Sequence, residues 1–361
     1  MSRTSDVRSA PSWHKIQVFR WDADYVLLTN KVLLPVLPAL GPGSHTASYF
    51  ETDWFRGPHL TLALSADAYS SEEIERILVC TKQHVSTLPG SLGVDPQEYR
   101  SVHERLKVYE GRSGDVFPWI PDGTVRMTQH DDRVQRIGSA AANVVDDFQC
   151  RAFDMELRLL SSMERTRGGV DSYAMRLMAT CAAKFSNSGI LAASPSFMSH
   201  ARGYLGMEGN EGLTIVWENS FRRLREDLIR FVQRCEDSAR GTTVDTDSGI
   251  EILGVLNELF EDQHSYKAFL PAVGWVERLR SRSEFHRQLA KNDRWVREVE
   301  QDEWFAGYRM ILNLLYIHLT KMGLTPHRRF YICYLIARTV EEMSGVDSLE
   351  LLEGERTWKD R

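Results

Sequence analysis

The sequence ASYFETDWFRGPHLTLALSA at residues 47–66 sets the fold class of this chain. Its two ends, 47–54 and 59–66, are short runs typical of β-strands, and Gly57-Pro58 between them is a turn signal. The pattern predicts a β-hairpin. Another strand is expected at Trp13–Trp21, where apolar and polar side chains alternate, with helices before and after the hairpin. Strands grouped in this way indicate an α+β fold rather than repeating βαβ units.

Helices are expected along most of the remaining chain. Their expected ranges are 140–164, 171–186, 195–207, 212–236, 249–262, 274–298, 302–322 and 326–344. The region before them, about 90–130, is rich in Gly and Pro, and one strand is expected in it, at Glu104–Tyr109. Gly323 and Thr325-Pro326 join the last two helices and favour an antiparallel helical hairpin. We therefore expect an antiparallel or mixed sheet in the N-terminal third, packed against a mainly helical C-terminal part.

The length and composition are typical of a globular chain. It has 361 residues, 42% of them hydrophobic and 26% charged. Residues 1–12 read as a flexible lead-in. Residues 13–361 are expected to form a single domain, with a sheet-containing part at 13–130 and a mainly helical part at 131–361. No apolar stretch approaches the roughly 18 residues of a membrane span, and the five cysteines lack zinc-type spacing. We expect a soluble, cytoplasmic protein with reduced thiols.

Charge and motifs exclude several classes of function. The 44 basic and 50 acidic residues give a net charge of -6, so no general field attracts nucleic acid or an anionic membrane. The chain lacks a phosphate-binding loop, a dinucleotide fingerprint, a zinc-protease motif and a nucleophile elbow. Asp131-Asp132 reads as a pair of solvated charges in a polar loop. We therefore expect no metal, no nucleic acid and no membrane as partners.

Five segments together resemble one known family. They are residues 13–37 (WHKIQVFRW and the helix DYVLLTNKVLLPVL), the hairpin at 46–64, FPWIPDGTV at 117–125, SPSFMSHARGYL at 194–205, and the end of the chain at 313–345. In order and spacing they resemble the C-terminal, elimination-type domain of lantibiotic dehydratases and its stand-alone relatives in thiopeptide biosynthesis. None is a short catalytic signature, so the resemblance depends on their order across about 330 residues.

The resemblance implies a choice between two chemistries. Elimination domains remove glutamate from glutamylated Ser or Thr, and their strand after Gly-Pro-His typically reads H-[LI]-R-[LV]-R. Here it reads His59-Leu60-Thr61-Leu62-Ala63, and two neutral residues replace the guanidinium groups that would bind a carboxylate. The resemblance is therefore to the branch of thiopeptide pyridine synthases. Glutamate elimination and a non-catalytic helper that binds the leader peptide stay open as alternatives.

A pyridine synthase joins two dehydroalanines in a formal [4+2] cycloaddition, loses water and expels the leader peptide. The implied partner is a leader-bearing precursor peptide that contains azoles and dehydroalanines, and no cofactor is implied. A homodimer is left open. The reaction needs a pocket that brings two alkenes together and groups that move protons.

Three residues are candidates for catalysis: Tyr316, His318 and His59. Tyr316 is the first choice, because a phenol on a helix shoulder can hydrogen bond an amide. His318 is the second choice, because an imidazole can exchange protons, but at about 100° per residue the two lie on opposite shoulders of the helix and do not form a dyad. Simple packing is the alternative for both. For His59 the alternative is a surface residue beside the turn.

Substrate contacts are expected from three other groups of residues. Aromatic rings near the hairpin and the Pro/Gly-rich segment could stack on azoles; they are Trp54, Phe55, Phe117 and Trp119. Ser199 and His200 are neighbours on a helix, point apart and are expected to touch substrate rather than form a nucleophile pair. The basic helix around Arg223 could hold an acidic leader, although acidic neighbours favour a solvated surface.

Overall fold

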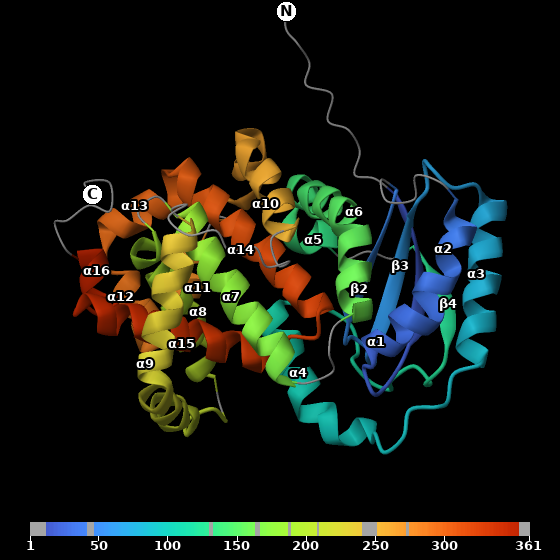
Figure 1. Ribbon diagram of the computed structural model, residues 1–361, viewed down its shortest axis with the longest axis horizontal. Coiled ribbons are helices and arrows are strands. Elements are labelled where there is room, and N and C mark those ends of the chain that lie inside the picture. The colour runs from blue at the N-terminus through green and yellow to red at the C-terminus, as the bar shows by residue number, and fades with distance from the viewer. Residues whose placement is uncertain are drawn as a thin grey trace, which may run out of the picture. The chain divides into compact units, whose positions relative to one another are not determined.

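The computed structural model describes residues 12–41, 47–129, 133–162, 167–186, 189–207, 209–239, 251–271 and 274–353. The chain divides into two compact units, Met1–Arg165 and Thr166–Arg361 (Figure 1). Each unit has its own buried core. The lead-in expected at residues 1–12, apart from Ser12, and the pair Asp131-Asp132 lie outside the described residues. The single domain expected over residues 13–361 stays a prediction.

The first unit contains a four-stranded antiparallel sheet. Its strands, in the order β2-β3-β1-β4, are β2 Ser48–Asp53, β3 His59–Ser65, β1 Trp13–Phe19 and β4 Val125–Thr128. The predicted hairpin is confirmed, with Asp53 opposite His59 and Tyr49 opposite Ala63. Its turn needs left-handed backbone, with φ of 60° at Arg56 and 108° at Gly57. The antiparallel sheet confirms the α+β class.

Helices surround this sheet within the first unit. They are α1 Tyr25–Leu28, the π-turn Thr29–Leu33, α2 Leu34–Leu40, α3 Ser71–Ser86, the 3₁₀ turn Pro96–Tyr99, α4 Arg100–Glu110, α5 Arg133–Ile137 and α6 Ser139–Ser162. Helices α2 and α3 lie side by side (Figure 1). The expected cap Asp24 accepts a hydrogen bond from the Leu27 amide, and Ser70 and Glu73 form a capping box at α3.

The strand expected at Glu104–Tyr109 is wrong, because this segment is the second half of α4. A left-handed Gly111 ends the helix, and its amide bonds back to the carbonyl groups of Lys107 and Val108. The fourth strand of the sheet is instead β4, which has only four residues and was not expected from the sequence.

The second unit is helical throughout its described part. Its helices are α7 Arg167–Phe185, α8 Ile190–Leu205, α9 Leu213–Ala239, α10 Glu251–Glu261, the 3₁₀ helix Gln263–Phe269, α11 Trp275–Arg280, α12 Glu284–Leu289, α13 Asp293–Gln301, α14 Glu303–Lys321, α15 Pro326–Ser344 and α16 Glu350–Glu353. The single helix expected at 274–298 is wrong. Two caps divide it: Ser283 accepts from the amide of His286, and Asn292 accepts from the amide of Trp295.

The two long terminal helices have the expected bounds but not the expected packing. Helix α15 packs on α8, α9 and α7, whereas α14 packs on α7, α10, α13 and the 3₁₀ helix at 263–269. The antiparallel hairpin expected for this pair is therefore wrong, although Tyr316 of α14 still touches Cys333 of α15. No described helix has both the length and the apolar run needed to cross a bilayer.

Candidate functional site

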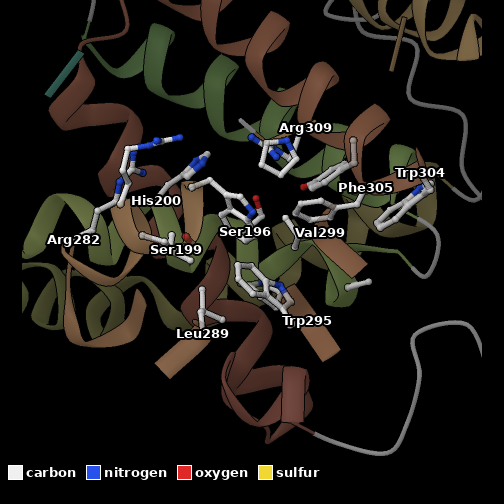
Figure 2. Close-up of a pocket in the computed structure, with 17 residues that line it drawn as sticks. Ser196, Ser199, His200, Arg282, Leu289, Trp295, Val299, Trp304, Phe305 and Arg309 are labelled. Carbon is white, nitrogen blue, oxygen red and sulfur yellow. The ribbon is translucent and has the colours of Figure 1, made fainter. Parts of the chain in front are cut away.

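A pocket of about 330 Å³ opens within the second unit, between α8, α11, α12, α13 and α14 (Figure 2). One part of its lining is aromatic, and its members are Trp275, Trp295, Trp304, Phe305 and Tyr308. Another part is basic, and its members are His200, Arg278, Arg282 and Arg309. Its volume is at the small end of the range for ligand pockets, and its mix of rings and polar groups is typical of them.

Helix α8 presents two neighbouring polar residues to this pocket. Both Ser199 and His200 line it, and each bonds a different partner because successive helical side chains point about 100° apart. The Ser199 hydroxyl lies 3.0 Å from Nε2 of His286. Nδ1 of His200 lies 3.0 Å from the hydroxyl of Tyr316. The structure therefore separates these neighbours as expected and adds a partner to each.

The His200–Tyr316 pair is held in its neutral form. Burial and the positive charges of Arg329 and Arg282 lower the pKa of His200 to about 3. Burial also raises the pKa of Tyr316 well above its usual value. Tyr316 does not itself line the pocket, so its hydroxyl reaches the pocket only through the imidazole. Because a neutral imidazole can take a proton at one nitrogen and release one at the other, this pair can relay a proton.

Ser199 belongs to a second hydrogen-bonded group that the sequence did not reveal. His286 is buried, and its Nδ1 lies 2.7 Å from the hydroxyl of Ser283, the N-cap of α12. Burial, followed by the charge of Arg282, lowers the pKa of His286 to about 4. The third member of this group is a serine rather than a carboxylate, so the group orients Ser199 but lacks the acid of a hydrolytic triad.

His318 lies away from the pocket. It is fully buried on α14, and its Nε2 is 2.7 Å from the hydroxyl of Tyr173 on α7. The expectation that Tyr316 and His318 do not form a dyad is confirmed, because they bond different partners. A catalytic role for either stays a prediction.

His59 is a buried residue of the sheet. It is 2% exposed, its Nδ1 lies 2.9 Å from the Gly57 carbonyl, and its Nε2 lies 3.0 Å from the side-chain amide of Gln17. Its ring packs on Phe19, with 4.5 Å between centroids. The alternative of a surface histidine is therefore wrong. Burial lowers its pKa despite the opposing charge of Asp53, so the ring favours its neutral form.

The four aromatic residues expected to contact substrate lie together in the first unit. Trp54 and Trp119 both pack on His103 of α4, at centroid distances of 4.9 and 5.2 Å. Phe117 stacks on Trp119 at 6.0 Å, and Phe55 lies under the guanidinium of Arg112 at 4.4 Å. His103 was not singled out from the sequence; it lies just before the strand expected at Glu104–Tyr109, in a segment expected to be irregular. The substrate-binding role of these rings stays a prediction.

Arg223 is exposed on α9 and does not line the pocket. Its basic neighbours pair with acids: Arg222 with Glu218 at 3.0 Å and Arg225 with Glu342 at 2.5 Å. These pairs support the solvated surface expected for this helix. A leader-binding role for Arg223 stays a prediction.

The sequence pointed to two pocket residues, Ser199 and His200, but not to the rest. The one sequence signal for the rest of the pocket was a set of three tryptophans in an otherwise polar stretch, at positions 275, 295 and 304. Reading 274–298 as one helix placed Trp275 and Trp295 on different sides of a single axis and left Trp304 on the next helix. The three short helices observed there, together with α14, bring them to one wall. Within the described residues, no cluster of His, Cys, Asp and Glu is suited to hold a metal ion.

Comparisons with known proteins agree with the fold. The pyridine synthase TbtD from thiomuracin biosynthesis superposes with a TM-score of 0.67 at 24% identity, over 92% of this chain and 99% of that one. TsrL superposes with a TM-score of 0.67 at 18% identity, over 95% of this chain and 98% of that one. A search of the curated proteins gives no match. The family model for the C-terminal part of lantibiotic biosynthesis dehydratases matches residues 13–340, and the chain belongs to this family.

Proposed function

We propose that this protein is a thiopeptide pyridine synthase. The observation that carries the proposal is the end-to-end match, in fold and length, to a protein described as a pyridine synthase. The chain covers 99% of that protein. The substrate would be a leader-bearing precursor peptide with azoles and two dehydroalanines.

The reaction consists of bond changes that balance without an oxidant or a reductant. The amide before one dehydroalanine shifts its N–H proton to oxygen and becomes a 2-azadiene. Two carbon–carbon bonds to the second dehydroalanine then close the six-membered ring. The former amide oxygen leaves as water, and the leader leaves as a carboxamide with the nitrogen of the second dehydroalanine. The loss of water and the loss of the leader carboxamide each remove one hydrogen atom from the ring, so the product is an aromatic pyridine.

The His200–Tyr316 pair is suited to the proton shift. Nearby arginines disfavour an imidazolium, so a proton that reaches His200 is passed on rather than retained. The neutral ring and the protonated phenol together give and take one proton with no change in net charge. General acid–base assistance of this kind contributes about 10²–10⁴-fold to a rate.

The aromatic wall of the pocket is suited to hold the peptide in a folded shape. Trp275 and Trp295 lie 5.6 Å apart at an interplanar angle of 59°, and Trp304 stacks on Tyr308 at 5.8 Å. Thiazoles are flat and apolar, so they gain from contact with such rings. Holding two alkenes within reach of each other supplies much of the acceleration in an intramolecular reaction.

The sheet argues against glutamate elimination. Thr61 and Ala63 occupy the two positions where elimination domains carry arginines, and both are buried. Two of the nearby cations on this face already have acidic partners: Lys15 lies 2.8 Å from Glu51, and Arg112 lies 2.6 Å from Asp53. A departing glutamate would have to compete with these carboxylates.

The experiment that tests the function compares two substrates. The purified protein is incubated with a bis-dehydroalanine, azole-containing precursor and, separately, with a precursor glutamylated on serine. We expect ring closure of the first and no change in the second. Loss of glutamate from the second would establish elimination instead. Binding of the first without any change in mass would support the leader-binding helper.

A further inference from the structure

Among the residues that the structure describes, the lining of the pocket is basic but not acidic. Its lining contains three arginines and one histidine, but neither Asp nor Glu. In Figure 2 the side chains of Arg282 and Arg309 lie on either side of His200. Both arginines also lower the pKa of that histidine, which places their charges close to it. The pocket is therefore a region of positive charge.

Arg309 is the most informative of these residues. It is partly buried, and burial lowers its pKa, so its charge has lost part of its hydration. Among the residues that the structure describes, neither Arg309 nor Arg282 has an ion pair or a side-chain hydrogen bond. Most other arginines of this unit with described partners meet a carboxylate, as Arg338 does with Glu341 at 2.8 Å. A partly desolvated guanidinium without an acid is suited to an anionic ligand.

The residue before Arg309 supplies an independent observation. Tyr308 is 1% exposed and lines the pocket, yet its hydroxyl has no hydrogen-bond partner in the described part of the chain. Burial raises its pKa well above the usual value, so the hydroxyl keeps its proton. Buried hydroxyl groups are normally paired, and an unpaired one on a residue that lines a pocket is suited to donate to a ligand.

We propose that this pocket binds the C-terminal carboxylate of the peptide substrate. Arg309 and Arg282 face the carboxylate, and Tyr308 donates a hydrogen bond to it. The proposal rests on the proposed function, because that function makes the ligand a linear peptide whose modified core follows its leader. The C-terminus is the one carboxylate that every such peptide carries. The neighbouring aromatic wall would then hold the last azoles of the core.

The test is a binding measurement that requires no turnover. A core peptide is titrated into the full-length protein by calorimetry, once with a free C-terminal acid and once as the C-terminal amide. We expect the amide to bind about 10- to 100-fold more weakly, as for the loss of a charge-assisted hydrogen bond. Arg309→Gln should remove this preference, Arg309→Lys should keep part of it, and Tyr308→Phe should reduce it.

Arg287→Gln is the matched control. Arg287 is exposed on α12 beside the pocket and pairs with Glu284, so the variant loses the same charge and should keep the full preference. Melting temperatures of all variants show whether they fold. Equal affinity of the two peptides would overturn the proposal, as would a preference that survives in the Arg282→Gln/Arg309→Gln double variant. If the affinity depends on an internal Asp or Glu of the peptide rather than on its free C-terminal acid, the choice of the C-terminus is wrong. Cyclisation of the amide peptide at an unchanged kcat/KM would overturn this proposal alone and leave the proposed function intact.

Discussion

Replacing Tyr316 with phenylalanine removes one hydroxyl from the His200–Tyr316 pair and leaves the ring in place. That hydroxyl makes a 3.0 Å hydrogen bond to His200 and a 3.6 Å contact to the thiol of Cys333. Packing should persist, since the ring is 93% covered and lies under the guanidinium of Arg329 at 4.8 Å. Loss of one neutral hydrogen bond costs about 0.5–1.5 kcal/mol, so the melting temperature should fall by only a few degrees.

The effect on the rate distinguishes a chemical role from a structural one. If the phenol relays a proton, Tyr316→Phe should lower the rate of pyridine formation by about 10²–10⁴-fold under single-turnover conditions. A hydroxyl that only holds His200 in place should cost roughly three- to tenfold. We expect the larger loss, with unchanged affinity for the precursor. A loss below tenfold would refute the relay.

Tyr173→Phe is the matched control for that experiment. It removes a phenol that makes a comparable 2.7 Å hydrogen bond to a histidine, His318, away from the pocket. The rate of pyridine formation by this variant should stay within a fewfold of the rate of the natural protein. Should Tyr173→Phe instead show the larger loss, the relay would pass through His318, and the assignment of His200 would be wrong.

Two further predictions concern stability. Gly307→Ala should destabilise the protein by roughly 1–3 kcal/mol, because the new Cβ would lie 2.8 Å from ring carbons of the buried Tyr266. Gly254→Ala, where no atom lies within 4 Å, should be neutral or slightly stabilising; equal melting temperatures of the two variants would contradict this. The free energy of unfolding should also fall as the pH drops from about 6.5 to 4. In the folded protein the pKa values of His200 and His286 are lowered from 6.5 to about 3 and about 4, so unfolding takes up protons in that range. A higher melting temperature at pH 5 than at pH 7 would contradict these assignments.

The sequence predicted those parts of the fold whose signals are local. The β2–β3 hairpin follows from two strand-like runs around Gly57-Pro58, and α15 begins at Pro326 behind its Thr325 cap. The prediction of a single helix at 274–298 was wrong because Ser283 and Asn292 were read as positions within that helix. Each of them instead caps a new helix. Short polar residues are favoured at N-caps but also occur within helices, and tertiary contacts decide between the two positions.

The candidate site was predictable only in part, since its members come from separate elements. Ser199 and His200 were found because they stand together in one motif. His286 lies 87 positions from its partner Ser199, and periodicity carries no information at that distance. Arg309 and Tyr308 were read as ordinary residues of a helix. Their significance depends on having no hydrogen-bond partner for their side chains among the described residues, and no sequence pattern shows this.

The mass of the released leader peptide tests the central claim most directly. Cyclisation by the proposed route leaves the nitrogen of the second dehydroalanine on the leader, so the account predicts a leader that ends in a carboxamide. This leader should appear at the same rate as a pyridine-containing macrocycle that has lost water. A leader that ends in a carboxylate, or a precursor that keeps its leader while its dehydroalanines disappear, would contradict the account.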